Sequence, residues 1–82
     1  MASHVAQVVE TIAKALVDAP DAVKVTESEH RGTTLVELTV ASGETGKVIG
    51  RQGRIADALR TLVEATAHQD GVKAVLEIRD PD

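Results

Sequence analysis

The chain has 82 residues, no cysteine, no aromatic residue and a formal net charge of −4. This length suits one small domain with a core of Val, Leu, Ile and Ala, and the composition excludes disulfides, cysteine-based metal sites and base stacking on aromatic rings. The lack of cysteine fits a reducing, cytoplasmic location. No apolar run approaches the ~20 residues of a membrane-spanning helix, and the acidic balance is unusual for a general nucleic-acid binder.

The N-terminal segment predicts an amphipathic helix. Apolar residues follow helical spacing from Val5 to Leu16, and Pro20 prevents the helix from continuing. Residues 1–4 are expected to fray, with Ser3 as a candidate N-cap.

Two alternating segments then predict a β-hairpin. Residues 23–29 and 33–40 each alternate apolar and polar side chains, and the link between them is short enough for antiparallel pairing. Gly32 is the expected position of positive φ in the turn. One face of the second strand should be buried, with Val36, Leu38 and Val40.

The C-terminal half predicts two helices and a last strand. A short helix capped by Ser42 is expected to end at Ile49, a longer one to cover residues 54–68, and a strand to run from Val72 to Arg79. The inner face of the longer helix is predicted to hold Ile55, Ala58, Leu59, Leu62, Val63 and Thr66.

The predicted order is therefore α-β-β-α-α-β, an α+β fold. The two helices between the second and third strands make a connection long enough for a parallel, right-handed crossover. We expect a three-stranded mixed sheet with the helices packed on one face. The domain is predicted to span residues 5–79, followed by a tail at 80–82.

One stretch joins the two C-terminal helices and carries the clearest functional signal. It is a GxxG turn flanked by apolar and basic residues: Lys47, Val48, Ile49, Gly50, Arg51, Gln52, Gly53, Arg54 and Ile55. Glycines let a ligand approach the backbone, amides at a helix start favour anions, and arginine matches phosphate geometry. This pattern predicts a phosphate-contacting turn, whereas a bare GxxG is more often only a structural turn.

Charge is distributed unevenly around this stretch. Residues 46–60 carry four basic residues and one acid, a charge of +3, whereas the rest of the chain carries five basic and twelve acidic residues, a charge of −7. This predicts contact with a few phosphates and repulsion elsewhere. Arg60 lies off the face of Arg54 and is assigned at most a peripheral contact.

The element order and the GxxG turn resemble the type II KH domain, a fold that binds single-stranded nucleic acid. The segment from Gly46 to Ala56, and Ala15-Leu16-Val17-Asp18 before a proline, are similar to the KhpA-type family of small bacterial single-KH proteins. The resemblance covers about residues 5–79. One departure from the general KH pattern is Ala56, where an isoleucine is usual.

The resemblance implies a function and a partner. The loop would clamp the backbone of about four nucleotides of single-stranded RNA, with bases on an aliphatic groove. It also implies an RNA chaperone or post-transcriptional regulator that forms a homodimer or pairs with a second KH-containing RNA-binding protein. Candidates for the groove wall are Val48, Ile49 and Ile55, with Leu38 and Val40 as weaker candidates that equally suit the core.

Other functions have less support. An adaptor that mainly dimerises is the alternative, and a DNA-binding helix-turn-helix is a third hypothesis. A P-loop is excluded by Ala41 and Val48 at its required positions. Since His4, His30 and His68 are scattered and no catalytic set emerges, we expect no enzyme activity, cofactor, metal, membrane contact or small-molecule substrate.

Overall fold

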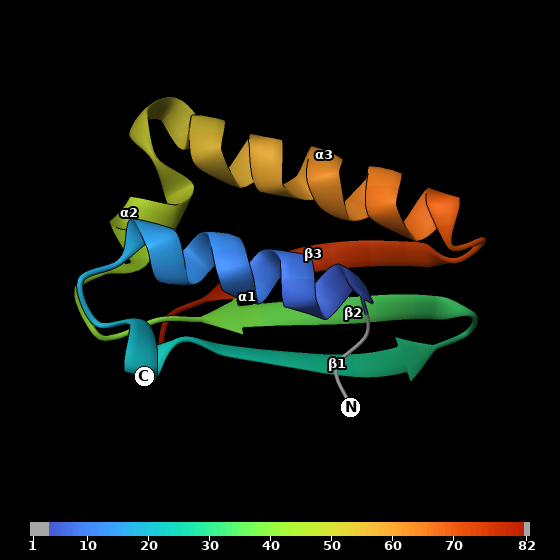
Figure 1. The fold of residues 1–82 in the computed structure, drawn as a ribbon, viewed down its shortest axis with the longest axis horizontal. Coiled ribbons are helices and arrows are strands. Elements are labelled where there is room, and N and C mark those ends of the chain that lie inside the picture. The colour runs from blue at the N-terminus through green and yellow to red at the C-terminus, as the bar shows by residue number, and fades with distance from the viewer. Residues whose placement is uncertain (1–3, 82) are drawn as a thin grey trace.

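The computed structural model describes residues 4–81, and its elements follow the predicted α-β-β-α-α-β order (Figure 1). Residues 1–3, including the candidate cap Ser3, lie outside the described part, and His4 already belongs to the first helix. The elements are α1 His4–Leu16, β1 Lys24–His30, β2 Thr33–Thr39, α2 Thr45–Ile49, α3 Arg54–Gln69 and β3 Lys73–Arg79, with 3₁₀ turns at Pro20–Ala22 and Arg51–Gly53.

The sheet has the strand order β1-β2-β3 and is mixed, as predicted. β1 and β2 pair antiparallel, whereas β2 and β3 pair parallel, with Thr33 opposite Lys73 and Thr39 opposite Arg79. The hairpin turn has positive φ at Arg31 (53°) and at Gly32 (80°), which confirms the expectation for Gly32. Two such residues are what a type I′ turn requires.

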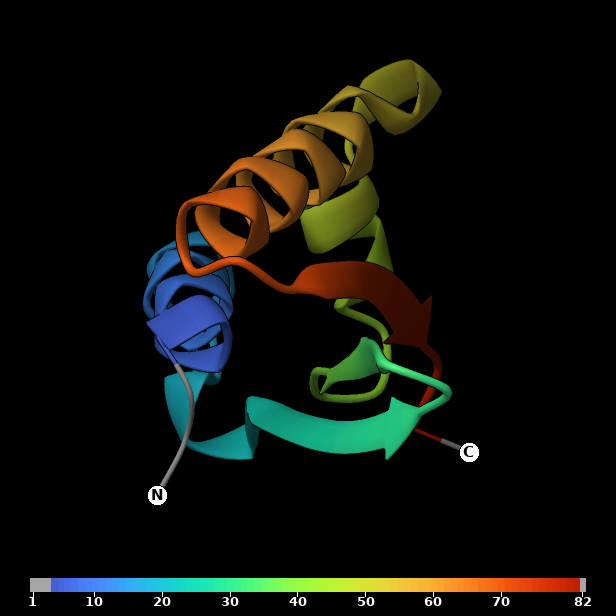
Figure 2. The ribbon, with the colours of Figure 1, turned by 90° about the vertical axis from the view of Figure 1, so that its right-hand side faces the viewer.

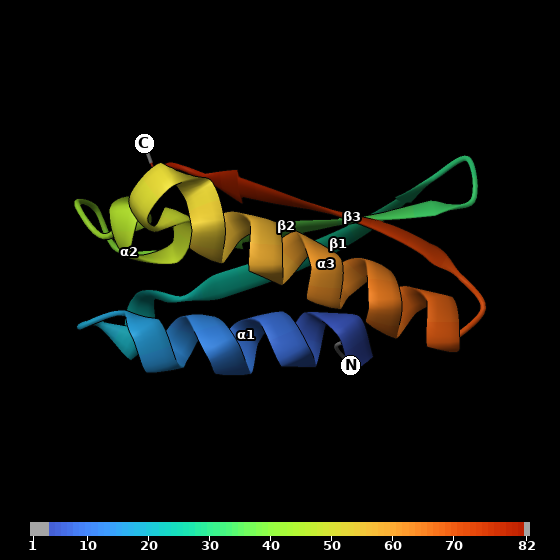
Figure 3. The ribbon, with the colours of Figure 1, turned by 90° about the horizontal axis from the view of Figure 1, so that it is seen from above.

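The two long helices lie on the same face of the sheet (Figures 2 and 3). The core between helices and sheet is aliphatic, because the chain has no aromatic residue. The largest fully buried side chains are Leu38, Leu59, Val9, Val36, Val40, Val48 and Val63. The burial of Val36, Leu38 and Val40 confirms the predicted inner face of the second strand.

The predicted inner face of α3 is wrong in part. Leu62 is 43% exposed and Ala58 is also exposed, whereas the buried stripe consists of Ala56, Leu59, Val63 and Ala67. The predicted and the observed buried faces of α3 both have helical spacing, but the observed face is turned so that it includes Ala56 and Ala67 in place of Leu62. A small side chain allows close packing of α3 against the layer below, so the helix buries alanine and leaves a leucine partly in solvent.

The start of α2 also differs from the prediction. The helix begins at Thr45 with Glu44 at its N-cap position, and no side chain caps it. Ser42 is exposed and is not the cap. The Glu44 side chain instead contacts the backbone of the residues that follow α1.

Candidate nucleic-acid interface

The loop between α2 and α3 takes backbone conformations that favour glycine. Gly50 has φ 77° and ψ 172°, and Gly53 has φ 73° and ψ 14°. Gln52, between them, also has a positive φ of 57°. The N–H of Gly50 donates to the Gly46 carbonyl at 2.9 Å, and the N–H of Gly53 donates to the Gly50 carbonyl at 3.1 Å. These bonds make a tight, ordered turn.

The two glycines serve different purposes. A Cβ at Gly50 would lie 2.6 Å from Cγ1 of Ile55, so this position must remain glycine for Ile55 to pack. A Cβ at Gly53 would meet nothing within 4 Å. Gly53 therefore faces open space, and the backbone there can be approached closely from outside.

The first turn of α3 begins directly at this open position. The first amides of a helix have no partner carbonyl within the helix, and the helix dipole favours an anion beside them. The residue at the N-cap of α3 is Gly53, which has no side chain that could satisfy these amides. No side chain therefore caps the first turn of α3, which begins beside exposed arginines, although the N–H of Arg54 already donates to the Arg51 carbonyl.

Two of the four nearby cations are unpaired within residues 4–81. Arg51 is exposed and makes no ion pair there, and Arg54 donates from Nη2 to Oε1 of Gln52 at 3.1 Å without meeting an acid. By contrast, Arg60 pairs with Asp57 at 3.4 Å, three residues earlier on the same helix. The predicted basic patch thus reduces to the guanidinium groups of Arg51 and Arg54.

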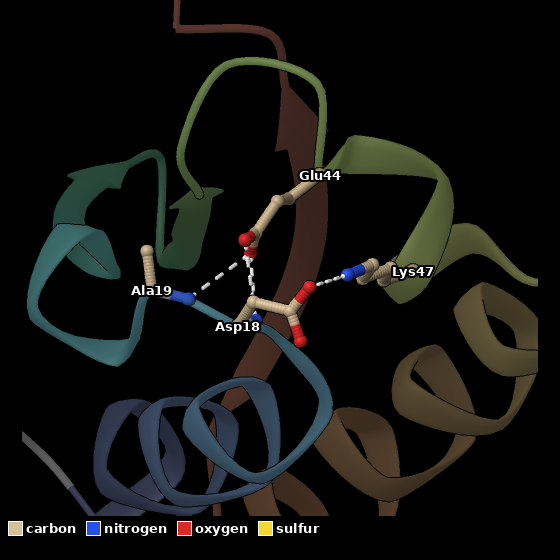
Figure 4. Close-up of polar contacts among 4 residues, drawn as sticks. All are labelled: Asp18, Ala19, Glu44 and Lys47. Carbon is tan, nitrogen blue, oxygen red and sulfur yellow. Dashed lines mark hydrogen bonds and ion pairs between the residues drawn. The ribbon is translucent and has the colours of Figure 1, made fainter.

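Lys47, which the sequence assigned to phosphate contact, faces the C-terminal end of α1 instead. Its Nζ forms an ion pair with Asp18 (Figure 4). Hydrogen bonding to the Asp18 carboxylate is the largest effect on the pKa of Lys47 and raises it. Desolvation opposes this shift, and attraction to Asp18 and Glu44 raises the pKa further. The charge of Lys47 is therefore already balanced by the protein.

The candidate groove residues separate into buried and accessible ones. Val48, Leu38 and Val40 are 0–1% exposed, so their side chains belong to the core. Ile49 is 38% exposed, and Ile55 is half-buried against Gly50. The accessible apolar surface beside the loop thus comes from Ile49 and from the exposed part of Ile55.

The structure adds one residue that the sequence reasoning missed. The Glu44 carboxylate accepts hydrogen bonds from the N–H of Asp18 at 3.0 and 3.2 Å and from the N–H of Ala19 at 3.5 Å (Figure 4). The partners lie 25 and 26 residues away, so no local pattern in the sequence indicates the contact.

Residues 4–81 hold neither a metal-binding cluster nor a membrane-spanning helix. No group of three or more His, Cys, Asp and Glu side chains is placed to hold a metal ion in this part of the chain. None of its helices is long and apolar enough to cross a membrane.

Comparison with known proteins identifies the family. The KH domain family described as KhpA/KhpB matches residues 6–78. A protein of Caldanaerobacter subterraneus named "RNA-binding protein KhpA" is 53% identical over 72 residues, which are 88% of this chain and 96% of that protein. A protein of the same name from Aquifex aeolicus is 51% identical over 76 residues, 93% of this chain and 96% of its own length.

A solved structure agrees at the level of the fold. A crystal structure of an Aquifex aeolicus Era variant bound to GDP and AlF4⁻ superimposes with a TM-score of 0.63 at 17% identity. The match covers 93% of this chain but 29% of the Era chain, so it is similar to one part of that protein. From the family match and the identities over nearly the full length, the chain belongs to the KhpA/KhpB KH domain family.

Proposed function

We propose that the loop at residues 50–53 and the first turn of α3 bind the sugar-phosphate backbone of single-stranded RNA. One observation carries this proposal. The guanidinium groups of Arg51 and Arg54, which make no ion pair within residues 4–81, lie close in the chain to the open backbone at Gly53. Both offer charge-assisted hydrogen bonds to phosphate oxygens. The name "RNA-binding protein KhpA" of several relatives supports RNA as the ligand.

Single strands suit this site better than duplexes. A KH loop clamps about four nucleotides, and a single strand leaves its bases free to lie on the aliphatic side chains of Ile49 and Ile55. Such contact requires no aromatic residue. The acidic body of the protein, with a net charge of −4, disfavours the broad electrostatic contact on which duplex binding depends.

The proposal extends to the cellular role. A small, weakly binding RNA clamp suits a cytoplasmic RNA chaperone or post-transcriptional regulator, and it includes no catalytic step. Because four nucleotides offer few contacts, association with a second copy or with a second KH-containing protein would raise affinity through avidity. Dimerisation is thus proposed as an aid to RNA binding and not as a separate adaptor function.

The proposal is tested by measuring affinity for single-stranded RNA, single-stranded DNA and duplex DNA of one sequence across a salt series. We expect single-stranded RNA to bind best, and the logarithm of its association constant to fall with the logarithm of salt concentration with a slope of about −1.5 to −3, as for two to four phosphates. Tight duplex binding with a slope near −10, as about ten phosphate contacts produce, would contradict the proposal.

A further inference from the structure

The helix that precedes the loop is too short to hold its own position. α2 has five residues, and its single buried side chain is Val48. An isolated helical turn is unstable in water because nucleation is unfavourable. The orientation of α2, and of the loop that starts at Gly50, is therefore set by contacts with the rest of the protein.

Glu44 makes the first of these contacts. Asp18 and Ala19 lie just beyond the end of α1 at Leu16, and the half-buried carboxylate of Glu44 accepts their N–H groups at 3.0 to 3.5 Å. A carboxylate that accepts backbone N–H groups forms charge-assisted hydrogen bonds, which are stronger than neutral ones. This contact joins the start of α2 to the end of α1.

Lys47 adds a second contact to the same place. It lies three residues after Glu44, on the same side of the single turn. Its Nζ forms an ion pair with the side chain of Asp18, and the backbone N–H of Asp18 donates to Glu44. Figure 4 shows the two side chains converging on Asp18 from α2. On the other side, Oγ1 of Thr45 donates to Oδ1 of Asp80 at 2.9 Å, which ties α2 to the end of β3.

We propose that Glu44 and Lys47 are positioning residues, which fix α2 to the end of α1 and so hold the glycine loop in its binding geometry. In this account Lys47 binds Asp18 in the RNA complex too and does not contact a phosphate. The inference rests on the proposed function of the loop. Pre-organisation of this kind raises affinity by reducing the ordering that binding requires.

Replacement of Glu44 distinguishes a role in positioning the loop from an effect of its negative charge on RNA affinity. Glu44→Ala removes a negative charge near the loop, so electrostatics alone predicts tighter RNA binding, whereas loss of positioning predicts weaker binding. We expect affinity for a short labelled single-stranded RNA of mixed sequence to fall about fivefold. Glu44→Gln keeps an acceptor oxygen and should retain most of the affinity.

The matched control for this replacement is Glu64→Ala. Glu64 is an exposed acid on α3, away from the contact between α1 and α2. The control should bind RNA as tightly as the wild type or slightly more tightly. Unchanged or improved affinity of Glu44→Ala, with a native circular dichroism spectrum, would overturn the positioning role of Glu44.

A charge exchange tests Lys47 in the same assay. Lys47→Asp alone places two carboxylates together and should weaken binding, and Asp18→Lys added to it should restore affinity to within about twofold. Restored affinity with an unchanged salt slope supports positioning. If Lys47 contacted a phosphate, the exchanged protein would stay weak and its slope would be shallower by about 0.7, which would overturn the proposal. Lys14→Asp controls for the change in net charge at a site on α1.

The loop variant Arg51→Asp/Gln52→Asp, measured in parallel, separates this inference from the proposed function. If the loop variant binds RNA like the wild type, the proposed function fails. The positioning inference alone fails under a different result. In that case the loop variant loses affinity, Glu44→Ala binds RNA as tightly as the wild type, and the charge-exchanged protein stays weak.

Discussion

The two halves of the segment from α2 to the start of α3 differ in what their side chains contact. Residues 44–50, which we call the anchored segment, are bound to the protein: Glu44 and Lys47 to the end of α1, Thr45 to Asp80, and Val48 to the core. Residues 51–54, the open segment, face solvent and make no ion pair within residues 4–81.

This difference shows that a basic residue near a glycine loop is not necessarily available to a ligand. Lys47 and Arg51 lie four residues apart in one stretch, yet only Lys47 has an acid beside it. Mutations of the anchored side chains of Glu44, Lys47 and Val48 should therefore change stability or loop geometry, whereas mutations in the open segment should change binding directly.

Among the loop variants, the largest effect is expected from alanine at Gly50. Gly50→Ala should lower the free energy of unfolding by about 3 kcal/mol, because the conformation at Gly50 is nearly restricted to glycine and the new Cβ would collide with Ile55. Gly53→Ala meets open space and adds only left-handed strain, about 1 kcal/mol. Urea denaturation measures both. Equal losses would contradict the different roles of the glycines.

Replacing side chains of the open segment should change the free energy of RNA binding and not that of unfolding, and by less than the loss of stability in Gly50→Ala. Arg51→Asp/Gln52→Asp keeps both glycines and should leave unfolding within about 0.5 kcal/mol of the wild type. RNA affinity should fall at least about tenfold, or ~1.4 kcal/mol, because repulsion replaces a charge-assisted bond. Fluorescence anisotropy and thermal melting provide the two readouts. A folded variant with wild-type affinity would show that the open segment is only a turn.

The smallest effect is expected at Leu62, on the exposed side of α3. Leu62→Ala should change stability by about 1 kcal/mol or less, because the side chain is 43% exposed and alanine favours helix. Leu59→Ala, at a residue 2% exposed, should lose about 2–5 kcal/mol. Denaturation of the pair tests which stripe of α3 is buried, and a larger loss at Leu62 would restore the sequence-based assignment.

The sequence predicted the elements of this fold because each has a strong local signal. Alternating apolar residues placed β2 and its buried face, and the glycine pair placed the loop. It assigned Leu62 to the core because both possible stripes on α3 have helical spacing, and hydrophobicity favours leucine over alanine. The choice between them depends on how closely α3 packs, which is a tertiary property that one helix does not encode.

The site was predictable in outline only. The position of the loop and of its basic residues follows from the sequence. Which of these basic residues forms an ion pair does not, because Lys47 and its partner Asp18 lie 29 residues apart. Ser42 was the natural candidate cap by residue type, yet α2 begins after Glu44, whose carboxylate binds the end of α1 instead. Neither contact leaves a local pattern that could have indicated it.

The central claim is that RNA contacts the open segment, and amide chemical-shift mapping tests it most directly. Single-stranded RNA added to isotope-labelled protein should shift the amides of residues 50–56 most, since they form the loop and the first turn of α3. Little change is expected at the distant turns around Gly32 and Gly71. If the largest shifts instead fell at those turns, with the loop amides unmoved, the account of the binding site would be wrong.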